Sequence, residues 1–136
     1  MFGMACKPGD QVMILACSGG SNVGQLTNQA AVELTREGFG KMSCLAGVGG
    51  ELLGFIHSAM TSPVVVVIDG CPIGCGKACF EKADVPLKAY LVLTDLGIEK
   101  NGDLELKADE IAKVKEAVKQ AVARFAAELP PGECGK

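Results

Sequence analysis

The sequence predicts an α/β protein with a mainly parallel four-stranded sheet covered by helices on both faces. Short apolar runs alternate with amphipathic segments, and glycine-rich turns separate them. This alternation is typical of parallel strands joined by right-handed helical crossovers. With 136 residues the chain has room for one domain, 1–136, whose core we place at about residues 11–129. The expected architecture is therefore a three-layer, Rossmann-like fold.

The first half of the chain supplies two strand–helix units. Residues 11–17 form an apolar run suited to a buried strand, and the next turn carries residues that cap helices. A helix is expected over 23–37, because apolar residues recur there at helical spacing, at Val23, Leu26, Ala30 and Leu34. A short strand over 41–45, a glycine-rich turn over 46–50 and a second helix over 51–60 follow.

The second half repeats the pattern. Residues 64–68 are five β-branched residues in a row, which favours a central strand covered on both faces. Pro72 suits the first turn of a helix running to about residue 82. A fourth strand is expected over 89–94 and a long helix over 108–129. The apolar face of that helix comprises Ile111, Val114, Val118, Ala121, Val122, Phe125 and Leu129.

Composition excludes several classes of partner. A net charge of −3, one tyrosine and no tryptophan provide neither a basic surface nor a stacking platform for nucleic acid. The apolar runs are far shorter than the roughly 20 residues needed to span a membrane. The apolar stretch ahead of Cys17 covers only residues 12–16, which is no signal-peptide core. We therefore expect a cytoplasmic protein; nothing in the sequence indicates its oligomeric state.

Seven cysteines require an explanation in a reducing compartment, where stable disulfides are rare. Cys17, Cys44 and Cys71 each stand at or directly after the end of a predicted strand, 27 residues apart. Since the carboxyl ends of parallel strands meet at one edge of a sheet, we expect these thiols to gather there. Their function would be metal binding or thiol chemistry.

Cys75 is the expected fourth member of this cluster. With Cys71 as the cap of the third helix, Cys75 would lie on the facing side of the first turn. Four thiolates at about 2.3 Å from Zn²⁺ make a closed tetrahedral site with a net charge near −2. Three helix N-termini and Lys77 would offset that charge, and the glycine-rich turns at those termini would also suit a small anion.

These motifs resemble the DGC-domain family. The resemblance rests on residues 17–26, on residues 44–50, and on Asp69-Gly70-Cys71-Pro72 followed by Cys75. It implies a zinc-binding protein with four chelating cysteines, which fall here on Cys17, Cys44, Cys71 and Cys75, and it implies no activity. Zinc is thus the expected cofactor.

Three further residues could belong to the site or to the framework of the fold. Cys79 would be an alternative ligand, a resolving thiol or a core residue, and Asp69 an acceptor that orients the site or part of a turn. His57, the one histidine, is assigned a structural role. Cys6 and Cys134 lie near the chain ends and are not expected to be ligands.

Three hypotheses for function follow. The first is a binding protein with a four-cysteine zinc site. The second is a thiol-based redox protein or enzyme, and the third an iron–sulfur protein, since four thiolates suit that cluster equally well. Phosphatase chemistry is disfavoured, because Val23 stands where an oxyanion-clamping arginine would be needed, and no Walker-type motif is present.

Overall fold

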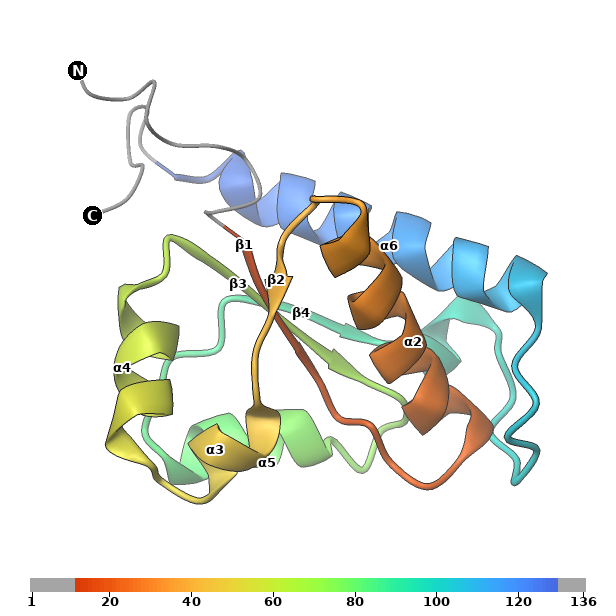
Figure 1. Ribbon diagram of the computed structural model, residues 1–136, viewed down its shortest axis with the longest axis horizontal. Helices are drawn as coiled ribbons and strands as arrows, with labels where there is room; N and C mark the ends of the chain where they lie inside the picture. Colours follow the sequence, from red (N-terminus) through yellow and green to blue (C-terminus); the bar gives the residue numbers. More distant parts are fainter. Residues whose placement is uncertain (1–11, 130–136) are drawn as a thin grey trace.

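The computed structural model describes residues 12–129 and contains a parallel sheet of four strands in the order β2-β1-β3-β4 (Figure 1). The strands are β1 (Val12–Ala16), β2 (Lys41–Met42), β3 (Val64–Asp69) and β4 (Ala89–Val92). Every residue of β3 is buried, as its β-branched run predicts. The register pairs Ala16 with Ile68, so β1 and β3 end side by side.

Helices cover both faces of this sheet, which confirms the three-layer, Rossmann-like architecture (Figure 1). On one face lie α2 (Asn22–Arg36) and α6 (Ala108–Ala126); on the other lie α3 (Leu45–Gly49), α4 (Leu53–Thr61) and α5 (Cys75–Lys82). The side chains of β3 alternate between the two cores. Val64, Val66 and Ile68 pack toward α2 and α6, whereas Val65 and Val67 pack toward the other layer.

The first and last helices show the amphipathic pattern that the sequence predicts. In α2 the four apolar positions expected to be buried are fully buried, and the Ser21 side chain caps the helix by accepting a hydrogen bond from the Gly24 amide. In α6 the buried residues are Val114, Val118, Ala121 and Val122. The other three apolar residues assigned to its face, Ile111, Phe125 and Leu129, are partly buried against the same core.

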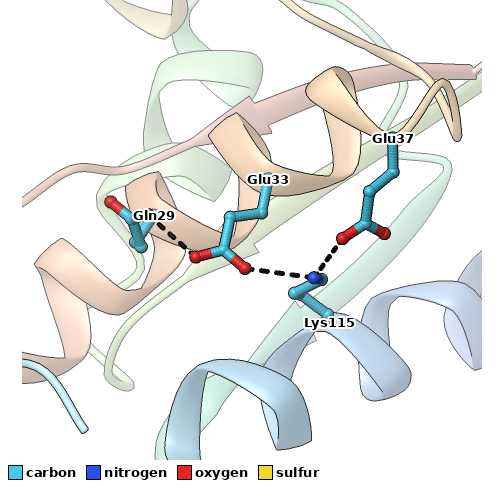
Figure 2. Close-up of polar contacts among 4 residues, drawn as sticks. All are labelled: Gln29, Glu33, Glu37 and Lys115. Atoms are coloured by element: carbon cyan, nitrogen blue, oxygen red, sulfur yellow. Dashed lines mark hydrogen bonds and ion pairs between the residues drawn. The ribbon is translucent and has the colours of Figure 1, made fainter. Parts of the chain in front are cut away.

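Polar contacts also join α2 to α6. Lys115 of α6 donates a hydrogen bond of 3.0 Å to Glu33 and another to Glu37, both on α2 (Figure 2). Gln29 donates to the other oxygen of Glu33 at 2.9 Å (Figure 2). These polar contacts supplement the apolar packing between the two helices.

Several element boundaries differ from the sequence-based expectation. The turn expected over 46–50 is the short helix α3, β2 ends at Met42, and α6 ends at Ala126. The helix α5 begins at Cys75 rather than at Pro72. Its N-cap is Gly74, whose φ of 71° places it in the left-handed region that glycine adopts without strain. An η2 turn of 3₁₀ helix (Leu93–Leu96) follows β4.

Within the part of the chain that the structure describes, no helix is both long and apolar enough to cross a membrane.

Candidate cysteine site

A cavity of about 150 Å³ lies at the carboxyl edge of the sheet, where β1 and β3 end. Three of the four predicted site residues line it: Cys17, Cys71 and Cys75. The backbone amide of Cys17 continues the sheet pairing by donating a 3.0 Å hydrogen bond to Ile68 O. The fold therefore brings together thiols that are 54 and 58 residues apart in the sequence.

Close backbone packing brings the cysteine-bearing loops together. A Cβ added to Gly24, in the first turn of α2, would lie 2.3 Å from Gly19 O. A Cβ added to Gly70 would lie 2.8 Å from the Gly24 amide nitrogen. Because neither position has room for a side chain, the loop after β1, the start of α2 and the loop after β3 can touch. In the loop after β1, Ser18 adopts a left-handed backbone conformation, with a φ of 53°.

Cys17 lies half-buried beside Thr27 of α2. Its Sγ is 3.7 Å from Thr27 Oγ1, which also accepts a hydrogen bond from the Ser18 amide at 3.1 Å. The Thr27 hydroxyl donates its own proton to Gly24 O at 2.6 Å. Because the Thr27 proton is used in this bond, the Thr27 oxygen is the side of the contact that can accept from Cys17.

Cys71 has a cationic neighbour that sequence reasoning missed. The Nζ of Lys100 donates to Cys71 Sγ at 3.4 Å, and Lys100 lines the same cavity. Lys77, the cation that the sequence suggests, does not line this cavity; its side chain borders a separate surface hollow. No local motif could reveal Lys100, because it lies 29 residues beyond Cys71 in an irregular segment.

Cys75 is the exposed first residue of α5, and Asp69 anchors that helix. The buried Asp69 carboxylate accepts hydrogen bonds from the amides of Gly76 at 2.7 Å and Lys77 at 3.0 Å. These bonds satisfy amides in the first turn of α5, as a helix cap does. The expectation that Cys71 caps this helix is therefore wrong, and Asp69 acts on the site by fixing the start of α5.

Cys44, Cys79 and His57 lie outside the cavity lining. Cys44 is the exposed N-cap of α3, one strand away from Cys17 at the same edge of the sheet. Cys79 faces α3 instead, since its Sγ would lie 2.7 Å from a Cβ added to Gly49. Burial raises the pKa of the Cys79 thiol, with the nearby Cys75 and Asp69 adding to the shift. His57 is exposed on α4.

The sequence matches the DGC domain over residues 13–118. This chain belongs to the DGC domain family. It is 34% identical over 102 residues to the protein named "Anaerobic and virulence modulator AnvM" of Pseudomonas aeruginosa, a match that covers 75% of this chain and 78% of that protein. A comparison with solved structures finds no match. The family resemblance carried by the cysteine motifs is thus confirmed.

The thiols of this DGC domain suit a soft metal ion in kind but are not arranged around one. Thiolate sulfur is a preferred donor for Zn²⁺ and for iron–sulfur clusters. Among residues 12–129, however, no three histidine, cysteine, aspartate or glutamate side chains are placed so that they could hold one ion. All five cysteines in that range are free thiols. Cys6 and Cys134 lie outside the described residues.

Proposed function

We propose that this DGC-family protein binds a soft metal ion, zinc in the first instance, through the cysteines at the sheet edge. The observation that supports it is the convergence of Cys17, Cys71 and Cys75 on one cavity. Cys44 begins α3 at the same edge and is the proposed fourth ligand. Binding would require thiol side chains to turn from their positions in the free protein, and Cys44 to move toward the cavity.

Such an ion would be carried by the protein rather than needed for its fold. The strand ends are already joined by the hydrogen bond from Cys17 to Ile68 and by the glycine contacts around Gly24. Two apolar cores pack against the sheet without any metal ligand at their centre. We therefore expect metal-free protein to stay folded, unlike a small domain in which zinc supplies the folding free energy.

Metal content of cysteine variants tests this proposal. The full chain is purified without oxygen, exposed to one equivalent of Zn²⁺, and separated from free metal before elemental analysis. Cys17→Ser, Cys71→Ser and Cys75→Ser should each lose most of the bound zinc, whereas Cys79→Ser, whose sulfur faces α3, should retain it. Retention of zinc by both Cys17→Ser and Cys71→Ser would contradict the proposed site.

The same preparation decides which metal is held and whether Cys44 takes part. If the purified protein absorbs visible light and contains iron, the bound group is an iron–sulfur cluster rather than zinc. If Cys44 is a ligand, Cys44→Ser should weaken zinc binding, as seen in competition with a chelator of known affinity. Unchanged affinity in Cys44→Ser would leave a site with three protein ligands.

A second candidate function is thiol–disulfide exchange at Cys71 and Cys75. It is favoured by the Lys100 ammonium at 3.4 Å from Cys71 Sγ and by the position of Cys75 in the first turn of α5. Oxidation would join the two sulfurs while a small disulfide takes up the two electrons and two protons and leaves as two thiols. The relative's name refers to anaerobic conditions, and a thiol site of this kind would suit such a role.

Peptide mapping after treatment with oxidised glutathione tests this second function. A Cys71–Cys75 disulfide, formed faster than mixed disulfides at Cys44, supports it. Mixed disulfides alone, with no bond between Cys71 and Cys75, would argue against it.

A further inference from the structure

We propose that Lys100 makes the cysteine cavity selective for small anions and that Asn22 positions Lys100 for this role. The inference rests on the cysteines of the proposed function and goes beyond the metal ion itself, because it assigns a charge to the second ligand or the reactant that meets the thiols. It rests on two features of the described chain: the charges that face the cavity and the hydrogen bonds that hold residues 99–101.

Two charged side chains line the cavity, Lys100 and Asp69. The Asp69 carboxylate already accepts hydrogen bonds from Gly76, Lys77 and Tyr90, which stabilise its negative charge and turn its oxygens toward α5 and β4. The Lys100 ammonium contacts Cys71 Sγ, and no carboxylate of residues 12–129 forms an ion pair with it. A ligand that approaches Cys71 therefore meets an uncompensated positive charge.

Residues 99–101 are held in place by Asn22, the first residue of α2. The Asn22 side chain donates to Glu99 O at 2.8 Å and accepts from the Asn101 amide at 2.6 Å. The Asn22 amide donates to Asn101 O at 2.9 Å. Asn22 is 6% exposed, so one end of each bond is shielded from water, and the bonds to residues 99 and 101 bracket Lys100 on both sides.

The size of the cavity limits the ligand class. A volume of about 150 Å³ is smaller than the roughly 300–1,000 Å³ of a pocket for a drug-sized ligand. The expected ligand is thus a small anion with a centre that reacts with thiols or shares a metal ion with them.

Charged methanethiosulfonate reagents test this selectivity on the reduced, metal-free full chain. A cysteine thiolate attacks the reagent's outer sulfur, forms a mixed disulfide and releases methanesulfinate. An anionic sulfonatoethyl reagent and a cationic trimethylammonium-ethyl reagent are compared, and the rate at each cysteine is read by quenching and peptide mass spectrometry. The ratio of the two rates cancels any change in the ionised fraction of the thiol, since that fraction affects both reagents equally.

Lys100→Met should lower the anionic-to-cationic rate ratio at Cys71 by roughly tenfold at low salt, and the loss should shrink as salt is added. Lys100→Arg should keep the ratio close to that of the unmodified protein. Lys77→Met is the matched control, because Lys77 borders a different hollow. Exposed Cys44, outside the cavity lining, is the internal reference in every sample.

Asn22→Ser tests the positioning role, since serine lacks the reach for both side-chain bonds yet is accepted at helix starts. It should lower the ratio at Cys71 in the same direction as Lys100→Met, with circular dichroism confirming that the chain is folded. An unchanged ratio in Lys100→Met, or an equal fall at Cys44, would overturn the selectivity. A fall in Lys100→Met but not in Asn22→Ser would overturn the role of Asn22. Because no metal is present, these outcomes are independent of the zinc measurements.

Discussion

The Tyr90 hydroxyl donates a 2.7 Å hydrogen bond to the Asp69 carboxylate, which links β4 to the helix that begins with Cys75. Asp69 is 1% exposed and accepts two further hydrogen bonds from the first turn of α5. One carboxylate thus joins the end of β3, the start of α5 and β4 directly beside the cysteine cavity.

Replacing Asp69 should cost more stability than removing the Tyr90 hydroxyl. Tyr90→Phe deletes one hydrogen bond and should lower the free energy of unfolding by about 1 kcal/mol. Asp69→Asn keeps one acceptor oxygen but places an NH₂ group against the other α5 amide, which is left without an acceptor, and this should cost about 2–3 kcal/mol. Urea unfolding at neutral pH measures both, and equal losses would contradict the capping role of Asp69.

Tyr90 should also make stability fall at alkaline pH. Burial, followed by the hydrogen bond to Asp69, raises the pKa of the Tyr90 phenol. Its contribution to stability is fully present below the unfolded pKa of about 10 and is lost as pH rises through the higher folded pKa. Melting temperatures should therefore decline above about pH 10, less steeply in Tyr90→Phe.

Because the chain has one tyrosine, the absorbance of its phenolate tests the cause directly. Ionisation in the folded protein should occur at a higher pH than in urea. If the phenolate titration curves of the folded and the urea-unfolded protein coincide, Tyr90 does not cause the loss of stability at alkaline pH.

Two helical glycines should respond in opposite ways to alanine. Gly24→Ala forces a Cβ against Gly19 O at 2.3 Å and should destabilise the protein by more than about 2 kcal/mol, because the obstacle is backbone. Gly54→Ala in α4 meets open space and should be neutral or stabilising by up to about 1 kcal/mol. Similar effects in the two variants, measured by thermal unfolding, would contradict the close packing of the cysteine loops.

The sequence allowed the sheet, the layers and the meeting of three thiols to be predicted, because hydrophobic periodicity and strand–helix length are local properties. The run at 64–68 has one reasonable environment. The spacing of 27 residues relates Cys17, Cys44 and Cys71, of which Cys17 and Cys71 line the cavity; the third thiol there is Cys75, four residues beyond Cys71. The start of α5 could not be derived in this way. Pro72 suits a helix start, but Gly74 supplies the left-handed cap and Asp69 bonds to the amides of Gly76 and Lys77 instead.

Lys100 and Cys44 show what local pattern does not contain. Lys100 reaches Cys71 because Asn22 holds residues 99–101, a contact across 77 to 79 residues of sequence. Cys44 stays outside the cavity lining because β2 is a two-residue edge strand and the chain turns at once into α3. Both outcomes depend on tertiary packing.

Cys79 should react slowly and should tolerate no added bulk opposite it. Its raised pKa keeps the thiol protonated at neutral pH, so alkylation at Cys79 should lag behind that at exposed Cys75.

Gly49→Ala should lower the free energy of unfolding by about 1–3 kcal/mol, because its Cβ would lie 2.7 Å from the Cys79 sulfur. Adding Cys79→Ala should recover part of that loss; strictly additive effects would show that the two residues do not touch.

Lys115 should stabilise the α2–α6 pair in a way that depends on salt and acid. Hydrogen bonds from Gln29 and then Lys115 lower the pKa of Glu33, and bonds to Glu37 and then Glu33 raise the pKa of Lys115 (Figure 2). A carboxylate with a lowered folded pKa contributes stability above its unfolded pKa of about 4.3, and this contribution is lost as pH falls through the folded value. Lys115→Met should lower the melting temperature by roughly 1–3 °C at neutral pH and low salt.

That difference should shrink as pH falls through the lowered pKa of Glu33, and in about 1 M salt, where surface charges are screened. Lys113→Met, an exposed lysine on the same helix, is the matched control and should change little under any of these conditions. If the loss in Lys115→Met is independent of both pH and salt, the packing of its aliphatic chain against α2, rather than its charge, stabilises the pair.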